Sequence, residues 1–191
     1  MAGPINVAKR LSQRDWLERA MSVLAREGGA RVTIDRLCQE LGVTKGSFYG
    51  HFVNREDFMM KLIAFWDEEF TQVVISELKG KGDQPAEARL LELMQLLNKQ
   101  ALARYDVAVR AWAAQDAAIA NEVHKVFRSR YKFVRALFQE IGFRDAELDM
   151  RVRVFVLFHS SDYGMYFKKL GKSAQEREIL LRHAFFTRPA G

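Results

Sequence analysis

The stretch Thr33–Phe52, TIDRLCQELGVTKGSFYGHF, constrains the fold of this chain more than any other part of its sequence. Apolar residues recur on one face of a first short helix that ends near Leu41, and a second short helix follows Thr44. Thr33 and Thr44 suit N-cap positions, because a hydroxyl oxygen accepts a hydrogen bond from a free amide of the first helical turn. Gly42 suits the left-handed residue that ends a helix. Two short helices joined by such a turn predict a helix-turn-helix.

The second of these helices presents a small, polar and basic surface. Val43, Phe48 and Phe52 can hold it against the first helix. The outward residues are Lys45, Gly46, Ser47, Tyr49, Gly50 and His51. They offer an ammonium, hydroxyls and an imidazole, which bind phosphates and base edges. We therefore interpret this helix as one that reads the major groove of DNA. The alternative is an ordinary helical hairpin in a bundle, with Phe48 and Tyr49 as core residues.

The rest of the sequence favours a protein built from helices. Its three prolines, Pro4, Pro85 and Pro189, lie outside every long segment with helical periodicity. The 191 residues suit one compact unit or two small units that share a helix. Apolar residues make up 49% of the chain and charged residues 28%, which is ordinary for a soluble globular protein. We expect an all-α fold of about nine helices, because helical spacing recurs along the whole chain.

Capping signals indicate where several helices begin. Asn54 can cap a long helix that leaves the helix-turn-helix and enters the rest of the protein. Asp106 is placed to open a short helix, and Ser173 with Glu176 has the pattern of a capping box for the last helix. The helix that begins at Asp145 is apolar on almost every side, so other helices must cover it on almost every side.

Positive charge is concentrated in the N-terminal quarter. The net charge of the whole chain is +6, and residues 1–55 hold nine Lys and Arg against five Asp and Glu. A basic module suits a polyanionic partner, although many basic surfaces only aid solubility. Residues 1–11 have the character of a basic arm through Lys9 and Arg10, and a disordered terminus is equally consistent with them.

Other classes of function find little support in the sequence. Cys38 is the single cysteine, which excludes an internal disulfide, and its inward position favours a buried residue over redox or metal chemistry. The four histidines, His51, His124, His159 and His183, are scattered, and no nucleophile with a nearby base stands out. We therefore expect no enzyme, no catalytic site, no metal site and no cofactor. No signal peptide and no apolar run long enough for a bilayer occur, which predicts a cytoplasmic protein without membrane contact.

The helix-turn-helix and its flanks resemble the TetR family of bacterial transcriptional regulators. The resemblance covers about residues 10–70 and rests on several short motifs. These motifs are Ala20, Leu24, Glu27-Gly28, Val32-Thr33, Leu37-Cys38, Leu41-Gly42-Val43, Gly46-Ser47-Phe48-Tyr49-Gly50-His51-Phe52 and Arg55-Glu56-Asp57. The chain departs from the family pattern at Gly29, where an aromatic residue is common, and at Cys38, where alanine is common. Gly50 departs too, and a glycine inside the recognition helix lowers helix propensity by about 1 kcal/mol relative to alanine.

The resemblance implies two domains and a DNA partner. Residues 10–70 would form a three-helix DNA-binding domain with its helix-turn-helix at 33–52 and its last helix shared, and residues 71–191 a helical regulatory and dimerisation domain. Family members are homodimers that pair their last two long helices in a four-helix bundle, which implies a palindromic operator in double-stranded DNA. The DNA-contacting residues implied here are Thr33, Thr44, Lys45, Gly46, Ser47, Tyr49, Gly50, His51 and Arg55.

The resemblance also implies a regulator, more specifically a repressor, that a small apolar or aromatic effector modulates or releases from DNA. The candidate pocket residues are Trp66, Phe70, Met94, Trp112, Phe127, Tyr131, Phe158, His159, Asp162 and Tyr166. His159 and Asp162 lie one helical turn apart and can form a polar handle in an apolar pocket. Three alternatives stay open: these side chains are plain core or dimer contacts, the regulator has no effector, or the chain is a helical protein-interaction adaptor.

Overall fold

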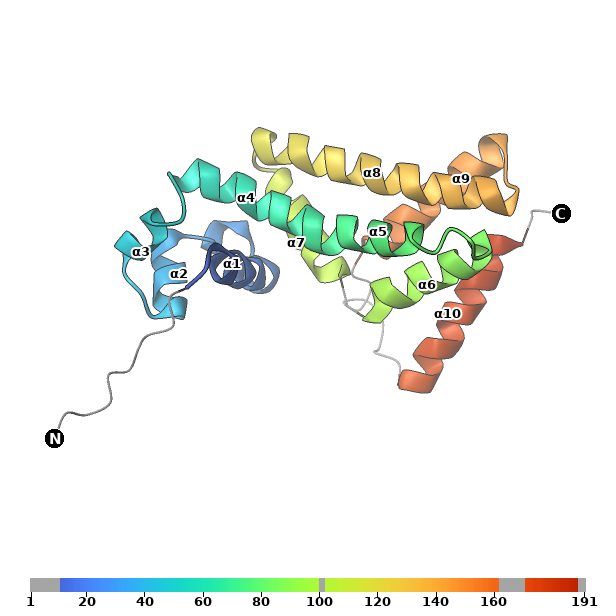
Figure 1. The fold of residues 1–191 in the computed structure, drawn as a ribbon, viewed down its shortest axis with the longest axis horizontal. Helices are drawn as coiled ribbons and strands as arrows, with labels where there is room; N and C mark the ends of the chain where they lie inside the picture. Colours follow the sequence, from blue (N-terminus) through green and yellow to red (C-terminus); the bar gives the residue numbers. More distant parts are fainter. Residues whose placement is uncertain (1–10, 100–101, 162–170, 189–191) are drawn as a thin grey trace.

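The computed structural model describes residues 11–99, 102–161 and 171–188, and every regular element in these ranges is helical. Figure 1 shows an elongated arrangement, with α1–α3 at one end and α9 and α10 at the other. The elements are α1 Gln13–Glu27, η1 Gly29–Arg31, α2 Ile34–Leu41, α3 Lys45–Tyr49, α4 Arg55–Asp67, η2 Glu68–Gln72, α5 Val73–Lys79, α6 Ala86–Lys99, α7 Ala103–Ala113, α8 Ala117–Ile141, α9 Asp145–His159 and α10 Lys172–Thr187. The all-α prediction is therefore confirmed.

The predicted long helix after Asn54 is present and contains an irregular turn. The backbone stays right-handed helical from α4 through the π-helical turn η2 into α5. A π-turn holds one residue more than an ordinary helical turn and occurs most often at functional sites. When α4, η2 and α5 are counted as one continuous helix, the described ranges contain nine helices besides the short 3₁₀ turn η1, in agreement with the sequence.

The predicted caps at Thr33 and Asn54 are present. The Thr33 hydroxyl accepts from the Arg36 amide at 3.2 Å, and Asn54 accepts from the Asp57 amide at 2.8 Å. The Ser12 hydroxyl likewise caps α1 by accepting from the Asp15 amide. Gly42 ends α2 in the left-handed conformation with φ of 68°. Local side-chain chemistry thus fixes the turns around the helix-turn-helix.

Four cap assignments need correction. Thr44 occupies the N-cap of α3, but its side chain makes no capping hydrogen bond. Gly50 follows α3 as its C-cap instead of lying inside the helix, so the expected propensity cost falls outside the regular segment. α10 begins at Lys172 without a side-chain cap, so the Ser173 capping box is absent. Asp106 lies buried within α7, because it pairs with groups from other helices instead of opening its own.

The buried side chains form two apolar cores. The N-terminal core joins α1–α4 to α7 and to the first half of α8, and its buried members include Trp16, Leu24, Leu37, Phe48, Phe52, Phe58, Leu62, Trp66, Val109, Trp112, Ile119, Val123 and Val126. The C-terminal core includes Val74, Leu78, Leu90, Met94, Phe133, Val134, Leu137, Phe138, Leu148, Val152, Phe155, Ile179 and Phe186. α8 has 25 residues, or about 37 Å at 1.5 Å per residue, and contributes to both cores. The predicted division at residue 70 stays a prediction, because helices from the C-terminal side complete the N-terminal core.

An aromatic cluster fixes α3 within the N-terminal core. Phe48 is fully buried, and its ring centroid lies 5.4 Å from that of Trp16, 4.9 Å from that of Phe52 and 5.3 Å from that of Phe58. Such pairs add to the stability that comes from apolar burial. A helix of five residues is too short to be stable alone, so this packing determines its orientation.

Replacement of Phe48 by alanine is expected to lower the free energy of unfolding by about 3–5 kcal/mol, because it removes buried contacts and leaves a cavity. Chemical denaturation followed by circular dichroism measures this loss. Val53→Ala is the matched control: Val53 is 81% exposed, so its loss should change stability by less than about 0.5 kcal/mol. Equal effects of the two substitutions would contradict the proposed anchoring of α3.

Candidate nucleic-acid interface and ligand cavity

All nine DNA-contact candidates lie at the protein surface around α3. Seven of them are exposed, and Ser47 and His51 are half-buried. Phe48 points into the core while its neighbour Tyr49 is 57% exposed, so the two faces of α3 divide as the sequence predicts. The backbone carbonyl of His51 accepts a hydrogen bond from the Gln13 side chain at 3.0 Å, which ties the residues after α3 to the start of α1.

The two glycines near α3 differ in what surrounds them. A Cβ atom added to Gly46 would have its nearest neighbour at 3.7 Å, an ordinary contact, so the fold itself does not require glycine there. A Cβ atom at Gly50 would approach the Ser47 carbonyl oxygen to 3.3 Å, a tight contact. The contact at Gly50 is with its own helical turn, and its φ of −72° is open to any residue, whereas Gly46 has no tight neighbour within the described protein.

The cations near α3 have different partners. The ammonium of Lys45 lies 2.7 Å from the Asp35 carboxylate on α2, and this hydrogen bond raises the pKa of Lys45. Arg55 stands in the first turn of α4 and has no ion-pair partner among the described residues. A cation at a helix N-terminus is unfavourable to the helix dipole, so Arg55 does not serve the stability of α4.

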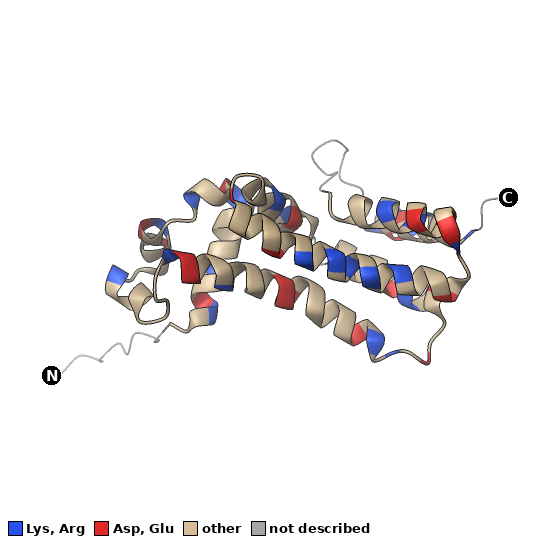
Figure 2. Cartoon of the chain, turned by 90° about the horizontal axis from the view of Figure 1, so that it is seen from above, with Lys and Arg blue, Asp and Glu red and all other residues tan. Residues whose placement is uncertain are grey.

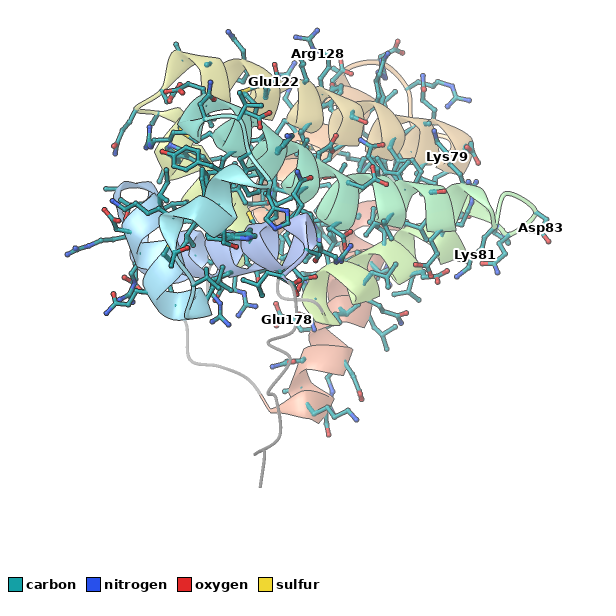
Figure 3. All side chains as sticks on the ribbon, turned by 60° about the vertical axis from the view of Figure 1, so that its left-hand side comes forward. Lys79, Lys81, Asp83, Glu122, Arg128 and Glu178 are labelled. Atoms are coloured by element: carbon teal, nitrogen blue, oxygen red, sulfur yellow. The ribbon has the colours of Figure 1, made fainter. Side chains whose placement is uncertain are left out.

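Positive charge also occurs far from α3, so charge alone does not identify the interface. Figure 2 shows Lys and Arg along α8 as well as near α1–α3, and Arg128 and Lys132 are exposed on α8. Figure 3 places Lys79, Lys81 and Asp83 around the turn between α5 and α6. There Lys81 pairs with carboxylates of α5 and α6.

A buried polar network connects the two cores. The indole N–H of Trp66 donates to Asp106 Oδ1 at 3.2 Å, and the Arg130 guanidinium donates to Asp106 Oδ2 at 2.6 Å. Arg130 Nε also donates to Thr71 Oγ1 at 2.9 Å. Asp106 and Thr71 are almost fully buried, and Arg130 lies over the Trp66 ring. The network links four elements: α4, η2, α7 and α8.

The π-turn η2 also contacts α1. Glu69 forms a bidentate ion pair with Arg14, with both N–O distances at 2.8 Å, and Arg14 binds Glu18 as well. The pKa of Arg14 is raised by its hydrogen bond to Glu69 first and to Glu18 second. Neighbouring residues of one turn thus hold α1 through Glu69 and α8 through Thr71. Sequence reasoning missed this turn, and the Asp106 contacts, because they depend on pairings between distant segments.

An apolar cavity of about 50 Å³ adjoins η2. Its lining residues are Phe70, Thr71, Val74, Ile75, Leu93, Leu97, Leu102, Arg130, Phe133, Val134, Phe155, Val156, His159 and Ser160. Of the predicted pocket residues, only Phe70 and His159 belong to this lining within the described ranges. Asp162 and Tyr166 lie outside the described residues, and so does the expected His159–Asp162 handle.

The other pocket candidates have packing contacts elsewhere. Trp66 belongs to the polar network, and Met94 is buried in the C-terminal core. The Phe127 ring lies 6.4 Å from the Trp66 ring, Tyr131 packs against the C-terminal core, and Phe158 lies beneath the Arg182 guanidinium.

Trp112 explains the glycine where the family commonly has an aromatic residue. A Cβ atom at Gly29 would lie 2.9 Å from the Trp112 ring, which is too close for a real contact. The indole of α7 therefore occupies the space beside η1. Trp112 is a contact between α7 and the N-terminal helices instead of a cavity residue.

His159 brings an unusual group to the cavity. Its Nδ1 lies 2.8 Å from the Phe155 carbonyl oxygen, which can only accept, so Nδ1 carries the hydrogen. Burial lowers the pKa of His159 to about 4, and the Phe155 hydrogen bond opposes that effect only in part. The imidazole is therefore neutral near pH 7. Its Nε2 is buried and has no hydrogen-bond partner among the described residues.

Residues 17–60 match the sequence pattern of the bacterial regulatory proteins, tetR family. This segment of the chain is similar to the TetR family. An uncharacterized HTH-type transcriptional regulator, YuxN of Bacillus subtilis, is 27% identical over 81 residues, which are 42% of this chain and 27% of that protein. The match therefore spans about a quarter of YuxN. The family that residues 17–60 resemble is one of bacterial regulatory proteins, and the matched part of YuxN belongs to an HTH-type transcriptional regulator.

Solved structures share the fold of this chain at low sequence identity. The fatty acid degradation regulator FadR of Bacillus halodurans has a TM-score of 0.68 and 17% identity, with 94% of this chain and 100% of that chain covered. Regulatory protein TetR of Rhodobacter sphaeroides has a TM-score of 0.64 and 20% identity, over 92% and 97% of the two chains. No helix in the described ranges is long and apolar enough to cross a membrane.

Gly29→Ala is expected to destabilise the protein by about 1–3 kcal/mol, because the new methyl group overlaps the Trp112 ring. In a Trp112→Leu background the same substitution should cost much less, because the ring is gone. A double-mutant cycle from denaturation curves measures the coupling between the two sites. Gly46→Ala, whose added methyl meets no close atom, is the glycine control. Additive effects at residues 29 and 112 would contradict the steric assignment.

Proposed function

We propose that this chain is a homodimeric TetR-type repressor that binds a palindromic operator through α3 and releases it when a small effector occupies the cavity beside η2. Residues 10–70 act as the DNA-binding domain and residues 71–191 as the regulatory and dimerisation domain, and the protein works in the cytoplasm. The observation that carries the proposal is α3 itself, a helix fixed by buried aromatics whose opposite face is small, polar and basic.

The DNA contacts follow from the character of the exposed residues. Lys45, Gly46 and Ser47 at the start of α3 face the bases, and the absence of a packing reason for Gly46 supports a close backbone approach to DNA. The remaining candidates bind the phosphate backbone or border it; they are Thr33, Thr44, Tyr49, Gly50, His51 and Arg55. Lys45 exchanges the Asp35 carboxylate for a DNA acceptor, and Arg55 meets a phosphate as its first anionic partner.

Exposed apolar side chains support the dimer. Large apolar residues with high exposure gather on α9 and α10, and they are Met150, Val154, Leu157, Leu180, Leu181 and Phe185. Met150, Val154 and Leu157 recur at helical spacing on α9, while α10 joins α9 through the Phe155–Phe186 ring contact at 5.2 Å. A second copy would cover this face and set two α3 helices about 34–36 Å apart on successive major grooves.

The position of the cavity supports effector control. Phe70 and Thr71 of η2 line the cavity, and Glu69 of the same turn binds Arg14 of α1. A molecule that fits the cavity better in one arrangement of η2 shifts the population towards that arrangement. The ion pair to α1 would carry the change to the DNA-binding helices, and thus alter the separation of the two α3 helices.

A Lys45→Ala/Tyr49→Ala double variant should lose binding to an operator selected from random duplexes by at least about 100-fold, because two contacts of roughly 1–3 kcal/mol each are removed. Fluorescence anisotropy at several salt concentrations measures affinity and salt slope. Unchanged thermal unfolding would separate lost contacts from lost folding. Lys132→Ala is the matched control, since this exposed lysine lies on α8 and should leave affinity unchanged. Operator binding that survives the double change would remove α3 as the reading helix.

A Leu181→Glu/Phe185→Glu variant should sediment as a monomer, because it places charges in the centre of the proposed dimer face. Analytical ultracentrifugation gives the mass directly. Val73→Glu changes an exposed apolar residue on α5 and should leave the dimer intact. A dimer of unchanged stability in the first variant would place the subunit interface elsewhere.

A further inference from the structure

The lining of the cavity restricts the chemistry of what it binds. Arg130 is the one charged residue of the lining among the described residues, and its guanidinium already donates to Asp106 Oδ2 and Thr71 Oγ1. The Asp106 carboxylate compensates the positive charge, so an anion gains no free cation there. Nor does a cation gain a carboxylate from the described part of the chain, where no acidic residue lines the cavity. Transfer of an unpaired charge into an apolar site is costly, which favours an uncharged molecule.

His159 adds a directional requirement. Since Nδ1–H is committed to the Phe155 carbonyl and the ring is neutral, Nε2 offers a lone pair. That nitrogen is buried and has no protein partner in the described ranges, and a buried acceptor without a partner costs free energy until a donor reaches it. The Phe155 ring, whose centroid lies 4.1 Å from that of the imidazole, limits how far His159 can turn away.

We propose that the cavity binds a compact, uncharged and largely apolar molecule with one hydrogen-bond donor, a hydroxyl or N–H, which His159 Nε2 accepts. The volume of about 50 Å³ exceeds several-fold the roughly 10–15 Å³ that one water requires, so the cavity has room for more than a single water and calls for a compact ligand. Apolar walls of Phe70, Val134 and Phe155 supply the burial, and His159 sets the specificity. The inference rests on the proposed effector function and defines its ligand class.

Three probes of similar size test the donor requirement. Phenol has the ring and the donor, toluene has the ring and a methyl group, and benzoate has the ring and a negative charge. Phenol should bind the full-length protein about tenfold more tightly than toluene, as one added neutral hydrogen bond implies, and benzoate should bind more weakly than phenol. Isothermal titration calorimetry and thermal shift measure these affinities.

The nitrogen itself gives a second readout. In protein labelled with ¹⁵N-histidine, long-range ¹H–¹⁵N spectra should show His159 as the neutral tautomer with Nε2 unprotonated. Phenol should move the Nε2 resonance and toluene should leave it in place. A protonated Nε2 in the free protein, or a Nε2 resonance indifferent to phenol, would overturn the assignment whether or not any variant folds.

Variants attribute the preference to one side chain. His159→Phe should abolish the preference for phenol over toluene, and His159→Gln, which keeps an acceptor oxygen, should retain part of it. His124→Gln changes an exposed histidine on α8 and should behave as the parent. The proposal fails if phenol does not bind, if phenol and toluene bind equally to the parent, or if the preference survives His159→Phe.

Operator affinity separates this inference from the function on which it rests. If phenol binds through His159 and the affinity for a selected operator falls, both the ligand class and effector control are supported. If phenol binds through His159 and operator affinity is unchanged, the ligand class stands and effector control fails. If toluene and phenol release the operator equally, effector control stands and the donor requirement fails.

Discussion

The buried Asp106–Arg130 ion pair is the interaction on which the junction of α4, η2, α7 and α8 depends. A carboxylate in an apolar interior is tolerated only where charge and hydrogen bonds compensate it. Asp106 obtains both from Arg130 and the Trp66 indole, and Arg130 in turn binds Thr71. These four side chains come from α7, α8, α4 and η2. The hydrogen bonds and the ion pair that compensate the buried carboxylate therefore hold these four elements together.

The π-turn η2 contacts α1 on one side and α8 on the other. An ordinary helical turn would rotate the following residues onto a different face, whereas the additional residue in η2 lets Thr71 reach Arg130 while Glu69 reaches Arg14. The helix that begins beside α3 is thus held at the same turn by α1 and by α8. Phe70 and Thr71 also line the cavity, so a molecule bound there touches the turn that joins the DNA-binding helices to the rest of the chain.

Local chemistry in the sequence was sufficient to predict the helix-turn-helix, whereas the cavity required long-range contacts. The caps at Thr33 and Asn54 and the left-handed Gly42 act within a few residues, so their roles can be inferred from the residues adjacent in the sequence. The exposed face of α3 follows from the same periodicity. The sequence predicts Trp66 and Trp112 as pocket residues because aromatic residues commonly line pockets, yet Trp66 donates to Asp106 and Trp112 packs beside Gly29, both in distant segments. The sequence predicts Asp106 as a cap, since an acidic residue near a helix start gives no local sign of an arginine on another helix.

Three glycines near the DNA-binding helices show how the same residue type serves different physical needs. Gly29 lacks a side chain because Trp112 occupies the space, and a side chain at Gly50 would meet the Ser47 carbonyl oxygen of its own turn. Gly46 faces no comparable neighbour, so the described fold alone does not account for it. An exposed glycine in a short helix costs stability relative to alanine, by about 1 kcal/mol. Under the proposed function, close approach of the α3 backbone to the DNA groove offsets this cost. The exposed glycine at position 46 thus supports α3 as the proposed surface for DNA.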